Sequence, residues 1–355
     1  MHLKRISPDR RGDGLMVHLI TGGSGFIGAR LAHRLLGTGA RVRILDIVDD
    51  ALRSPEVEFL HGSVTDREMV AEAMQGVEIV HHHAALVAQT SARSTYWSVN
   101  RDGAAIVAQE AVRAGVERIV HVSTTAIYGM PPAGPITLAT IPAPFEAYGQ
   151  SKLAGEQIMH AACEDARRPL ITIRPRVTLG AGRLGIFDIL FDWISEGRRI
   201  PVIGSGKQLQ QFVHVDDLID FYMLALEKGL GGDFNVGTDR FDSLGADLEN
   251  LIDNVKSASQ VLPLPVWPTV ATLQLLHAFG ASPLGPWHYK TYHRDCYFET
   301  EPLTALGWKP RYSNAEMLME SYDWFLANRH NTESGGSPHR SNLRQGALRL
   351  VKAFC

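Results

Sequence analysis

A tyrosine and a lysine four residues apart, Tyr148 and Lys152, could carry out proton transfer on a substrate. A helix would place both side chains on one face. The pKa of a free tyrosine is about 10, too high for a base at neutral pH, and a neighbouring ammonium group lowers it by stabilising the phenolate. Such a phenol can exchange a proton with a substrate oxygen while hydride moves at the adjacent carbon. This spacing alone occurs by chance on many helices. Downstream of a dinucleotide-binding motif, it predicts an oxidoreductase with Tyr148 and Lys152 as catalytic residues.

Three hydroxyl side chains follow a predicted strand upstream of this pair, at Ser123, Thr124 and Thr125. The carboxyl ends of parallel strands are where an open α/β sheet binds its ligand. One of these hydroxyls could hold the substrate oxygen. The alternative is that all three only satisfy backbone groups at the strand end.

A glycine-rich segment, TGGSGFIG at 21–28, lies between a predicted strand at 16–21 and a predicted helix at 25–37. Gly22 allows a tight turn, Gly25 lets the backbone approach a pyrophosphate, and Gly28 allows close packing of helix on strand. The anion then binds to free N–H groups at the helix N-terminus. The segment predicts a dinucleotide site.

Asp46 ends the second predicted strand, at 41–47. A carboxylate at this place accepts hydrogen bonds from both ribose hydroxyls and repels a 2′-phosphate, so we expect NAD as the cofactor rather than NADP. The next residue is Ile47 and not an arginine. Arg43 is expected on the opposite face of the strand.

The elements that must position these residues form a regular alternation. Further strands are predicted at 57–60, 79–83, 118–122 and 170–174, with helices between them. This order predicts an α/β fold, a Rossmann-type doubly wound parallel sheet. We expect an NAD-binding domain at 16–180, to which 207–240 partly return, and a smaller C-terminal α/β substrate-binding domain from 181–206 and 241–328. Residues 1–15 and 329–355 are expected to be flexible tails.

The composition excludes several classes of protein. The formal net charge is −3 and charged residues make up 21% of 355, which gives no reason to expect nucleic-acid binding. The three cysteines are far apart and fit a reducing, cytoplasmic compartment. No metal site is expected, because His81, His82 and His83 alternate across their strand. No run is long enough to span a membrane. The basic stretch at 343–355 could be an amphipathic helix for a membrane surface or a partner, or a frayed end.

Taken together, the motifs resemble those of the extended short-chain dehydrogenases/reductases, the group of NAD-dependent epimerases/dehydratases and 3β-hydroxysteroid dehydrogenase-like enzymes. The resemblance covers residues 16–328. It rests on these segments: TGGSGFIG, Asp46, His83-Ala84-Ala85, Asn100, STTAIYG, Tyr148 with Lys152, Arg174-Pro175, FVHVDDL and LGWKP.

The resemblance implies bound NAD, a small-molecule substrate and a homodimer. It makes Thr124 the third catalytic residue beside Tyr148 and Lys152. The implied cofactor-binding residues are Gly22, Gly25, Phe26, Ile27, Gly28, Asp46, Ser63, Val64, Ala84, Ala85, Asn100, Tyr148, Lys152, Pro175 and Val177. We expect Val87, Thr125, Arg176 and Gln210 to contact the substrate. In FVHVDDL, Asp216 or Asp217 is expected to cap the helix that follows.

Departures from the family pattern narrow the substrate. The related 4,6-dehydratases carry Asp-Glu where this chain has Thr125 and Ala126. Epimerases that act on sugar nucleotides hold the diphosphate with an asparagine and an arginine, which are Val177 and Gln210 here. Each lost contact to a charged group is worth about 1.5–3 kcal/mol. Arg176, Arg183 or Lys207 could compensate for this loss.

The segment at 261–289 contains no Asp, Glu, Lys or Arg. It could line a pocket for a bulky apolar substrate, touch a membrane peripherally, or pack in an ordinary core. We therefore expect hydride transfer at a secondary alcohol or ketone of a bulky, steroid- or lipid-like substrate. A sugar-nucleotide epimerase is the first alternative, and a non-catalytic NAD-binding scaffold is the second.

Overall fold

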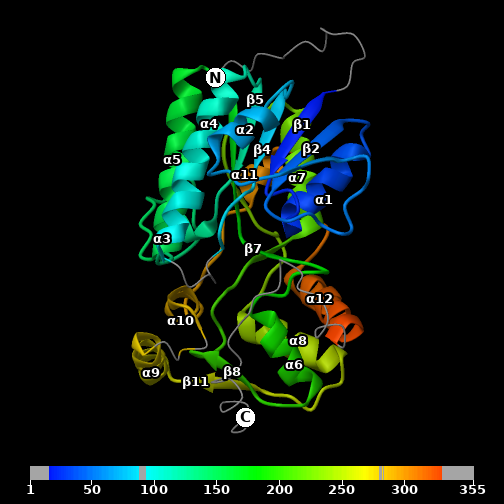
Figure 1. Cartoon of the computed structure of the whole chain (residues 1–355). Coiled ribbons are helices and arrows are strands. Elements are labelled where there is room, and N and C mark those ends of the chain that lie inside the picture. Colours follow the sequence, from blue (N-terminus) through cyan, green and yellow to red (C-terminus); the bar gives the residue numbers. More distant parts are fainter. Residues whose placement is uncertain (1–15, 88–92, 280–281, 283, 330–355) are drawn as a thin grey trace.

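The computed structural model describes residues 16–87, 93–279, 282 and 284–329. The segments expected to be flexible, 1–15 and almost all of 329–355, lie outside the described residues, and so does the basic stretch at 343–355. The described chain forms two stacked lobes (Figure 1).

The larger lobe is built on a seven-stranded parallel sheet in the order β10-β6-β5-β4-β1-β2-β3. The strands are β1 (Val17–Thr21), β2 (Arg41–Asp46), β3 (Glu58–His61), β4 (Ile79–His82), β5 (Arg118–Val122), β6 (Leu170–Pro175) and β10 (Gly232–Val236). The strands β2 and β3 follow β1 on one side of it, whereas β4, β5 and β6 are added on the other side. The carboxyl ends of β1 and β4 therefore flank a crevice. The α/β doubly wound fold predicted from the sequence is confirmed.

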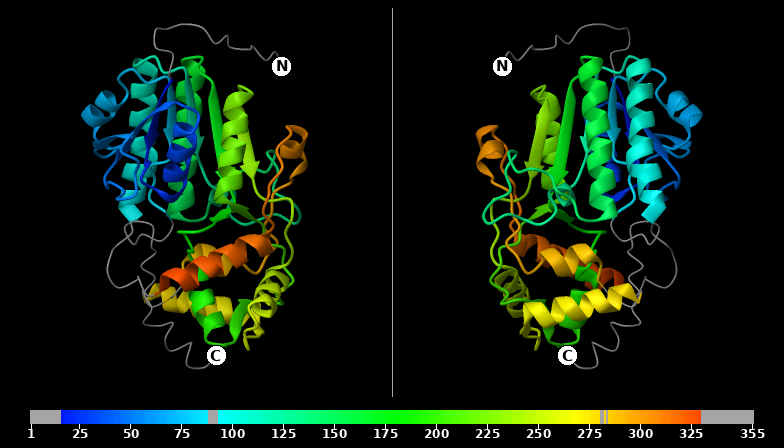
Figure 2. Two further views of the ribbon diagram at one scale, coloured as in Figure 1. Left: turned by 90° about the vertical axis from the view of Figure 1, so that its right-hand side faces the viewer. Right: turned by 90° about the vertical axis from the view of Figure 1, so that its left-hand side faces the viewer.

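Helices cover both faces of this sheet (Figures 1 and 2). One face is covered by α1 (Phe26–Leu36) and α7 (Val215–Glu227), the other by α2 (Arg67–Ala73), α4 (Ala104–Arg113) and α5 (Ala147–Asp165). Both faces are buried, and β5 accordingly has no exposed residue along RIVHV. α5 also packs closely on the π-helical turn η1 (Trp97–Gly103), where a Cβ on Gly155 would lie 2.2 Å from the Asn100 carbonyl oxygen.

The smaller lobe has its own apolar core, formed chiefly by α6 (Phe187–Ser195), α8 (Leu244–Asn254) and α12 (Asn314–Asn328). A two-stranded sheet, β8 (Ile200–Ile203) with β11 (Val261–Leu264), leads into α9 (Val266–Ala278) and α10 (Pro286–Thr291). The strands β7 (Val177–Leu179) and β9 (Phe212–His214) pair where the lobes meet.

One segment differs from the expected division of the chain. α11 (Glu301–Ala305) was expected in the smaller lobe, but Leu303 and Trp308 pack in the core beside α7. The Trp308 ring nitrogen donates a hydrogen bond to the Asp217 carbonyl oxygen. No helix among the described residues is both long and apolar enough to cross a membrane.

Candidate active site

A cavity of about 250 Å³ lies between the lobes at the carboxyl edge of the sheet. Its walls come from the ends of β4, β5 and β6, the start of α5, the loop after β7, and α10. Ten residues predicted for the site line it: Ile27, Ala85, Val87, Thr124, Thr125, Tyr148, Lys152, Pro175, Arg176 and Val177. The sequence-derived chemistry is thus gathered around one hollow.

The three expected catalytic side chains meet on one wall. Thr124 follows β5, and its hydroxyl accepts a hydrogen bond from the Ala126 amide at 3.2 Å and bonds to the Tyr148 side chain. Tyr148 lies in the first turn of α5. Lys152, one turn further on, is 3% exposed and donates from Nζ to the Val122 carbonyl oxygen at 2.6 Å. Strand end and helix start therefore hold the groups together.

The electrostatics of the pair differ from the expectation. Burial raises the pKa of Tyr148, and the opposing influences are the hydrogen bond to Thr124 and the positive charge of Arg183 rather than Lys152. Burial also lowers the pKa of Lys152 to about 8, against an opposing influence of Glu156. Tyr148 is therefore a protonated phenol at neutral pH in the protein without ligand.

The glycine-rich turn has the shape of a phosphate cradle. Gly22 has φ +70°, and a Cβ there would lie 2.6 Å from the Ala84 amide nitrogen. A Cβ on Gly28 would lie 2.6 Å from the Gly22 carbonyl oxygen. Gly25 is the N-cap of α1, so the free amides of its first turn, from Phe26 onward, face the crevice edge. Neither Gly22 nor Gly28 has room for a side chain, so the turn is tightly packed and its backbone amides stay open to the close approach of a pyrophosphate.

Asp46 stands beside this cradle at the end of β2. Its carboxylate accepts from the Ser24 amide at 3.0 Å and from the Val48 amide at 3.3 Å. These contacts fix the carboxylate next to the turn, where adenosine ribose hydroxyls would reach it. The geometry fits NAD.

Three other residues that were expected to bind the cofactor do not line this cavity. Asn100 bonds to both backbone groups of Leu86 and donates to the Ser151 hydroxyl at 3.1 Å, so it ties the loop after β4 to α5. The Ser63 hydroxyl bonds to Thr65, and Val64 is buried in the core beside α4. None of these three is among the residues that line the described cavity.

Two residues that were expected to contact the substrate, Arg176 and Gln210, donate hydrogen bonds to other groups of the protein. Arg176 lines the cavity, but it donates to the Gln211 carbonyl oxygen, Thr125 Oγ1 and Cys296 Sγ. Gln210 is 2% exposed, donates to the Arg294 carbonyl oxygen and does not reach the described cavity wall. The structure therefore does not bring Gln210 to this cavity, because its side chain is engaged with Arg294 within the lobe.

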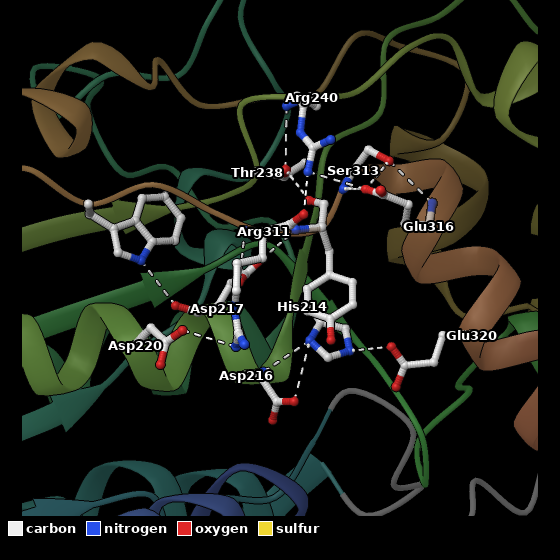
Figure 3. Close-up of polar contacts among 12 residues, drawn as sticks. His214, Asp216, Asp217, Asp220, Thr238, Arg240, Arg311, Ser313, Glu316 and Glu320 are labelled. Atoms are coloured by element: carbon white, nitrogen blue, oxygen red, sulfur yellow. Dashed lines mark hydrogen bonds and ion pairs between the residues drawn. The ribbon is translucent and has the colours of Figure 1, made fainter.

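The FVHVDDL segment builds a charged junction between the lobes (Figure 3). His214, rather than Asp216 or Asp217, caps α7 by accepting from the Asp216 amide, which corrects the sequence expectation. His214 Nε2 lies 3.1 Å from Glu320 of α12. Asp217 is 1% exposed and accepts from the amides of Arg311 and Tyr312, both at 3.0 Å. The segment ties α7 to the chain that enters α12.

The histidine run behaves as the strand pattern predicts. His81 bonds to His18, while His82 bonds to Thr21 on the other face. His83 bonds to Tyr222 of α7. Burial is the leading influence that lowers the pKa of all three, so they are neutral.

One cluster among the described residues, Glu156, His160 and Asp233, has side chains of metal-binding type. The guanidinium of Arg174 bonds to both carboxylates, and His160 pairs with Asp233 at 2.9 Å. The two acids thus share a cation that the protein supplies.

The cavity also contains residues that the sequence did not single out. Glu146, the N-cap of α5, lines it, and burial raises the pKa of this carboxyl to about 7. Its Oε1 is buried without a hydrogen-bond partner among the described residues. Trp287, His288 and Tyr292 also line the cavity, beside His83 of the His83-Ala84-Ala85 segment. The position two residues before Tyr148, at a helix start, was the available signal for Glu146.

Comparison with known proteins agrees with this geometry. The family model described as NAD dependent epimerase/dehydratase family matches residues 18–237. An uncharacterized protein, y4nG of Sinorhizobium fredii, is 38% identical over 94% of this chain and 85% of its own. Sterol demethylase protein B of Methylococcus capsulatus is 31% identical over 66% of this chain and 73% of its own.

Among solved structures, a UDP-glucose 4-epimerase of Thermotoga maritima with UDP-glucose is similar, with a TM-score of 0.72 at 23% identity. The match covers 90% of this chain and 100% of that one. The chain belongs to the NAD-dependent epimerase/dehydratase family. It is an enzyme of this family, and the predictions of family, fold and NAD as cofactor are confirmed.

Proposed function

We propose that this enzyme transfers hydride between NAD(H) and a secondary alcohol or ketone on a bulky substrate. The observation that carries the proposal is the meeting of Thr124, Tyr148 and Lys152 on one wall of the cavity, within the crevice that the glycine cradle borders. When bound, the nicotinamide supplies the hydride chemistry.

The protein's own residues hold and move the proton. The Thr124 hydroxyl and the Tyr148 phenol, hydrogen-bonded to each other, are placed to bind one substrate oxygen. Because burial raises the pKa of Tyr148, the phenol carries its proton at neutral pH and is ready to donate it to a carbonyl oxygen. Lys152, anchored on Val122, lies one helical turn from Tyr148 in the same cavity wall, where it can hold the bound cofactor.

The identity of the substrate is argued from the cavity wall. Val177 lines the cavity where related epimerases have an asparagine, and Gln210 is turned away from it. The charge-free segment contributes Trp287 and His288 to the wall. These features favour a bulky, steroid- or lipid-like molecule over a sugar nucleotide.

The rest of that charge-free segment, including α9, does not line the described cavity. α9 has no buried residue, and Trp267 is 81% and Phe279 78% exposed. Its apolar surface lies outside the cavity. Peripheral membrane contact through this face, a cytoplasmic location and a homodimer stay predictions.

The test of the proposal is Tyr148→Phe, assayed with NADH against 3-oxosteroids and long-chain ketones by the loss of nicotinamide absorbance. We expect turnover to fall about a thousandfold, because the substrate oxygen loses its proton donor. NADH affinity should stay within about twofold, since the glycine cradle is untouched. Turnover that survives in the phenylalanine variant would remove Tyr148 from the mechanism.

The epimerase alternative makes a separable prediction. UDP-, GDP- and dTDP-sugars should raise the melting temperature of an epimerase by mass action. The proposed function predicts no such shift, together with net oxidation of NADH in each cycle. A clear shift with a sugar nucleotide and none with sterols would reverse this assignment.

A further inference from the structure

We propose that Arg183 binds a carboxylate that the substrate carries within one or two carbons of the carbon that reacts. The inference rests on the proposed function and names a feature of its substrate. Arg183 follows β7 in the loop that closes the cavity, and it lines the same hollow as Tyr148. Three glycines with positive φ, Gly180, Gly182 and Gly185, frame it and fix the path of the loop.

The other shielded arginines of the described chain all have acceptors within the protein. Arg174 pairs with Glu156 and Asp233, and Arg118 donates to the Leu230 carbonyl oxygen. Arg176 has three acceptors in the lobe. These cations hold elements together.

Arg183 differs from them. No carboxylate among the residues that the structure describes lies within ion-pair distance of its guanidinium. Burial lowers its pKa, and the only opposing influence is the Tyr148 side chain. Arg183 is only partly buried, but it stands in the cavity wall without an acidic partner among the described residues, and a carboxylate matches its paired donors. The cavity is where such an anion can enter.

The position of Arg183 in the same cavity as Tyr148 also indicates where the substrate carries its carboxylate. Arg183 and Tyr148 both line the hollow, and the charge of Arg183 acts to lower the pKa of Tyr148 that burial raises, so the two groups face the same space. Tyr148 is to hold the oxygen on the reacting carbon, so a carboxylate on Arg183 must be close to that carbon along the substrate. The cofactor pyrophosphate is the competing anion, because the loop also packs on the start of α1, where Arg30 donates to the Ala181 carbonyl oxygen at 3.2 Å.

The experiment compares two probes that differ only in the charge. Racemic 3-hydroxydecanoate and its methyl ester are titrated calorimetrically into the protein loaded with NADH, a complex in which an alcohol cannot react. We expect the wild-type enzyme to bind the acid at least tenfold more tightly than the ester. In Arg183→Gln the two should bind within twofold of each other, and Arg183→Lys should restore part of the preference. Arg198→Gln, which changes an exposed arginine of the smaller lobe, is the matched control and should leave the preference intact.

Three results would overturn the proposal. Equal binding of acid and ester by the wild-type enzyme, or failure of both to bind, would show that no carboxylate is recognised beside the alcohol. A loss of NADH affinity in Arg183→Gln would assign the guanidinium to the pyrophosphate. An equal loss of both probes would mean that Arg183 acts only through Tyr148. None of these results touches the Tyr148→Phe test, so the proposed function and this inference can fail separately.

Discussion

The junction between the lobes and the cleft around Tyr148 both contain shielded charges, but only the junction satisfies them within the protein. At the junction, Asp217 accepts three hydrogen bonds, from the backbone amides of Arg311 and Tyr312 and from Arg311 Nε (Figure 3). In the cleft, Oε1 of Glu146 has no such partner among the described residues, and the Lys152 ammonium has only a carbonyl oxygen.

The difference separates two uses of a buried charge. A charge whose hydrogen bonds are all made within the chain fixes one segment on another, and its removal leaves the partners unsatisfied. A charge left incompletely paired lowers the stability of the fold, and it is tolerated where a ligand uses it. Removal should therefore destabilise the protein at the junction and stabilise it in the cleft.

The largest expected effect is at the junction. Asp217→Ala should lower the free energy of unfolding by about 3–5 kcal/mol, since the Tyr312 amide and Arg311 lose a buried acceptor. Urea unfolding at pH 7 measures it. Asp220→Ala is the matched control, one helical turn along α7. Its side chain is 28% exposed and pairs with Arg311 at 3.0 Å, so the loss should be under about 1 kcal/mol. Equal losses would mean that the junction does not depend on Asp217.

The fold itself could be predicted well from the sequence, for a physical reason. A parallel sheet covered on both faces needs strands that are buried along their whole length and rich in β-branched residues, as β5 and β6 are, separated by helices of regular period. Local pattern thus determined most elements. α11 was placed in the wrong lobe because its few residues carry no period. Its position depends on Leu303 and Trp308 packing against α7, a contact between segments far apart in the chain.

The second effect has the opposite sign. Burial lowers the pKa of Lys152 from 10.5 to about 8, so the folded protein resists the charged form. The cost of burying the ammonium is fully present below pH 8 and disappears as pH rises toward 10.5, where the lysine is neutral in both states. That cost is on the order of 3 kcal/mol in the wild-type protein. The methionine variant avoids it but loses the hydrogen bond to Val122, which offsets about 1.5 kcal/mol of the gain. Lys152→Met should thus stabilise the protein by about 1–2 kcal/mol at pH 7.

The measurement is urea unfolding of Lys152→Met and wild type at pH 7 and pH 10. The gain should shrink at pH 10, and turnover should be lost at both. Lys256→Met, at an exposed turn, should show no pH-dependent gain. A methionine variant less stable than wild type at pH 7 would mean that Lys152 is a structural cation like Arg174.

Residues of the candidate site could be predicted from the sequence only where their type and spacing together indicate one kind of chemistry. Tyr148 with Lys152 and the glycine turn are such patterns, and Ile27 of the turn segment lines the same cavity as the pair. Gln210 lies away from the cavity because the direction of a side chain in an irregular loop depends on its distant partner, here the Arg294 carbonyl oxygen. Glu146 was missed because an isolated glutamate at a helix start is ordinary in sequence. Only the cavity shows that its oxygen lacks a partner.

The smallest expected effect tests that oxygen. Burial raises the pKa of Glu146 from 4.5 to about 7. The carboxyl is protonated in both states below pH 4.5, and above pH 7 the folded protein must hold a buried carboxylate, so stability is lost between these values as pH rises. Glu146→Gln should therefore stabilise the protein by about 1 kcal/mol at pH 8 and have little effect at pH 5. Glu249→Gln, exposed on α8, should change stability by only a few tenths of a kcal/mol at either pH. If Glu146→Gln destabilises the protein at pH 8, the carboxylate has a partner in solution, and the contrast between cleft and junction then rests on Lys152 and Arg183 alone.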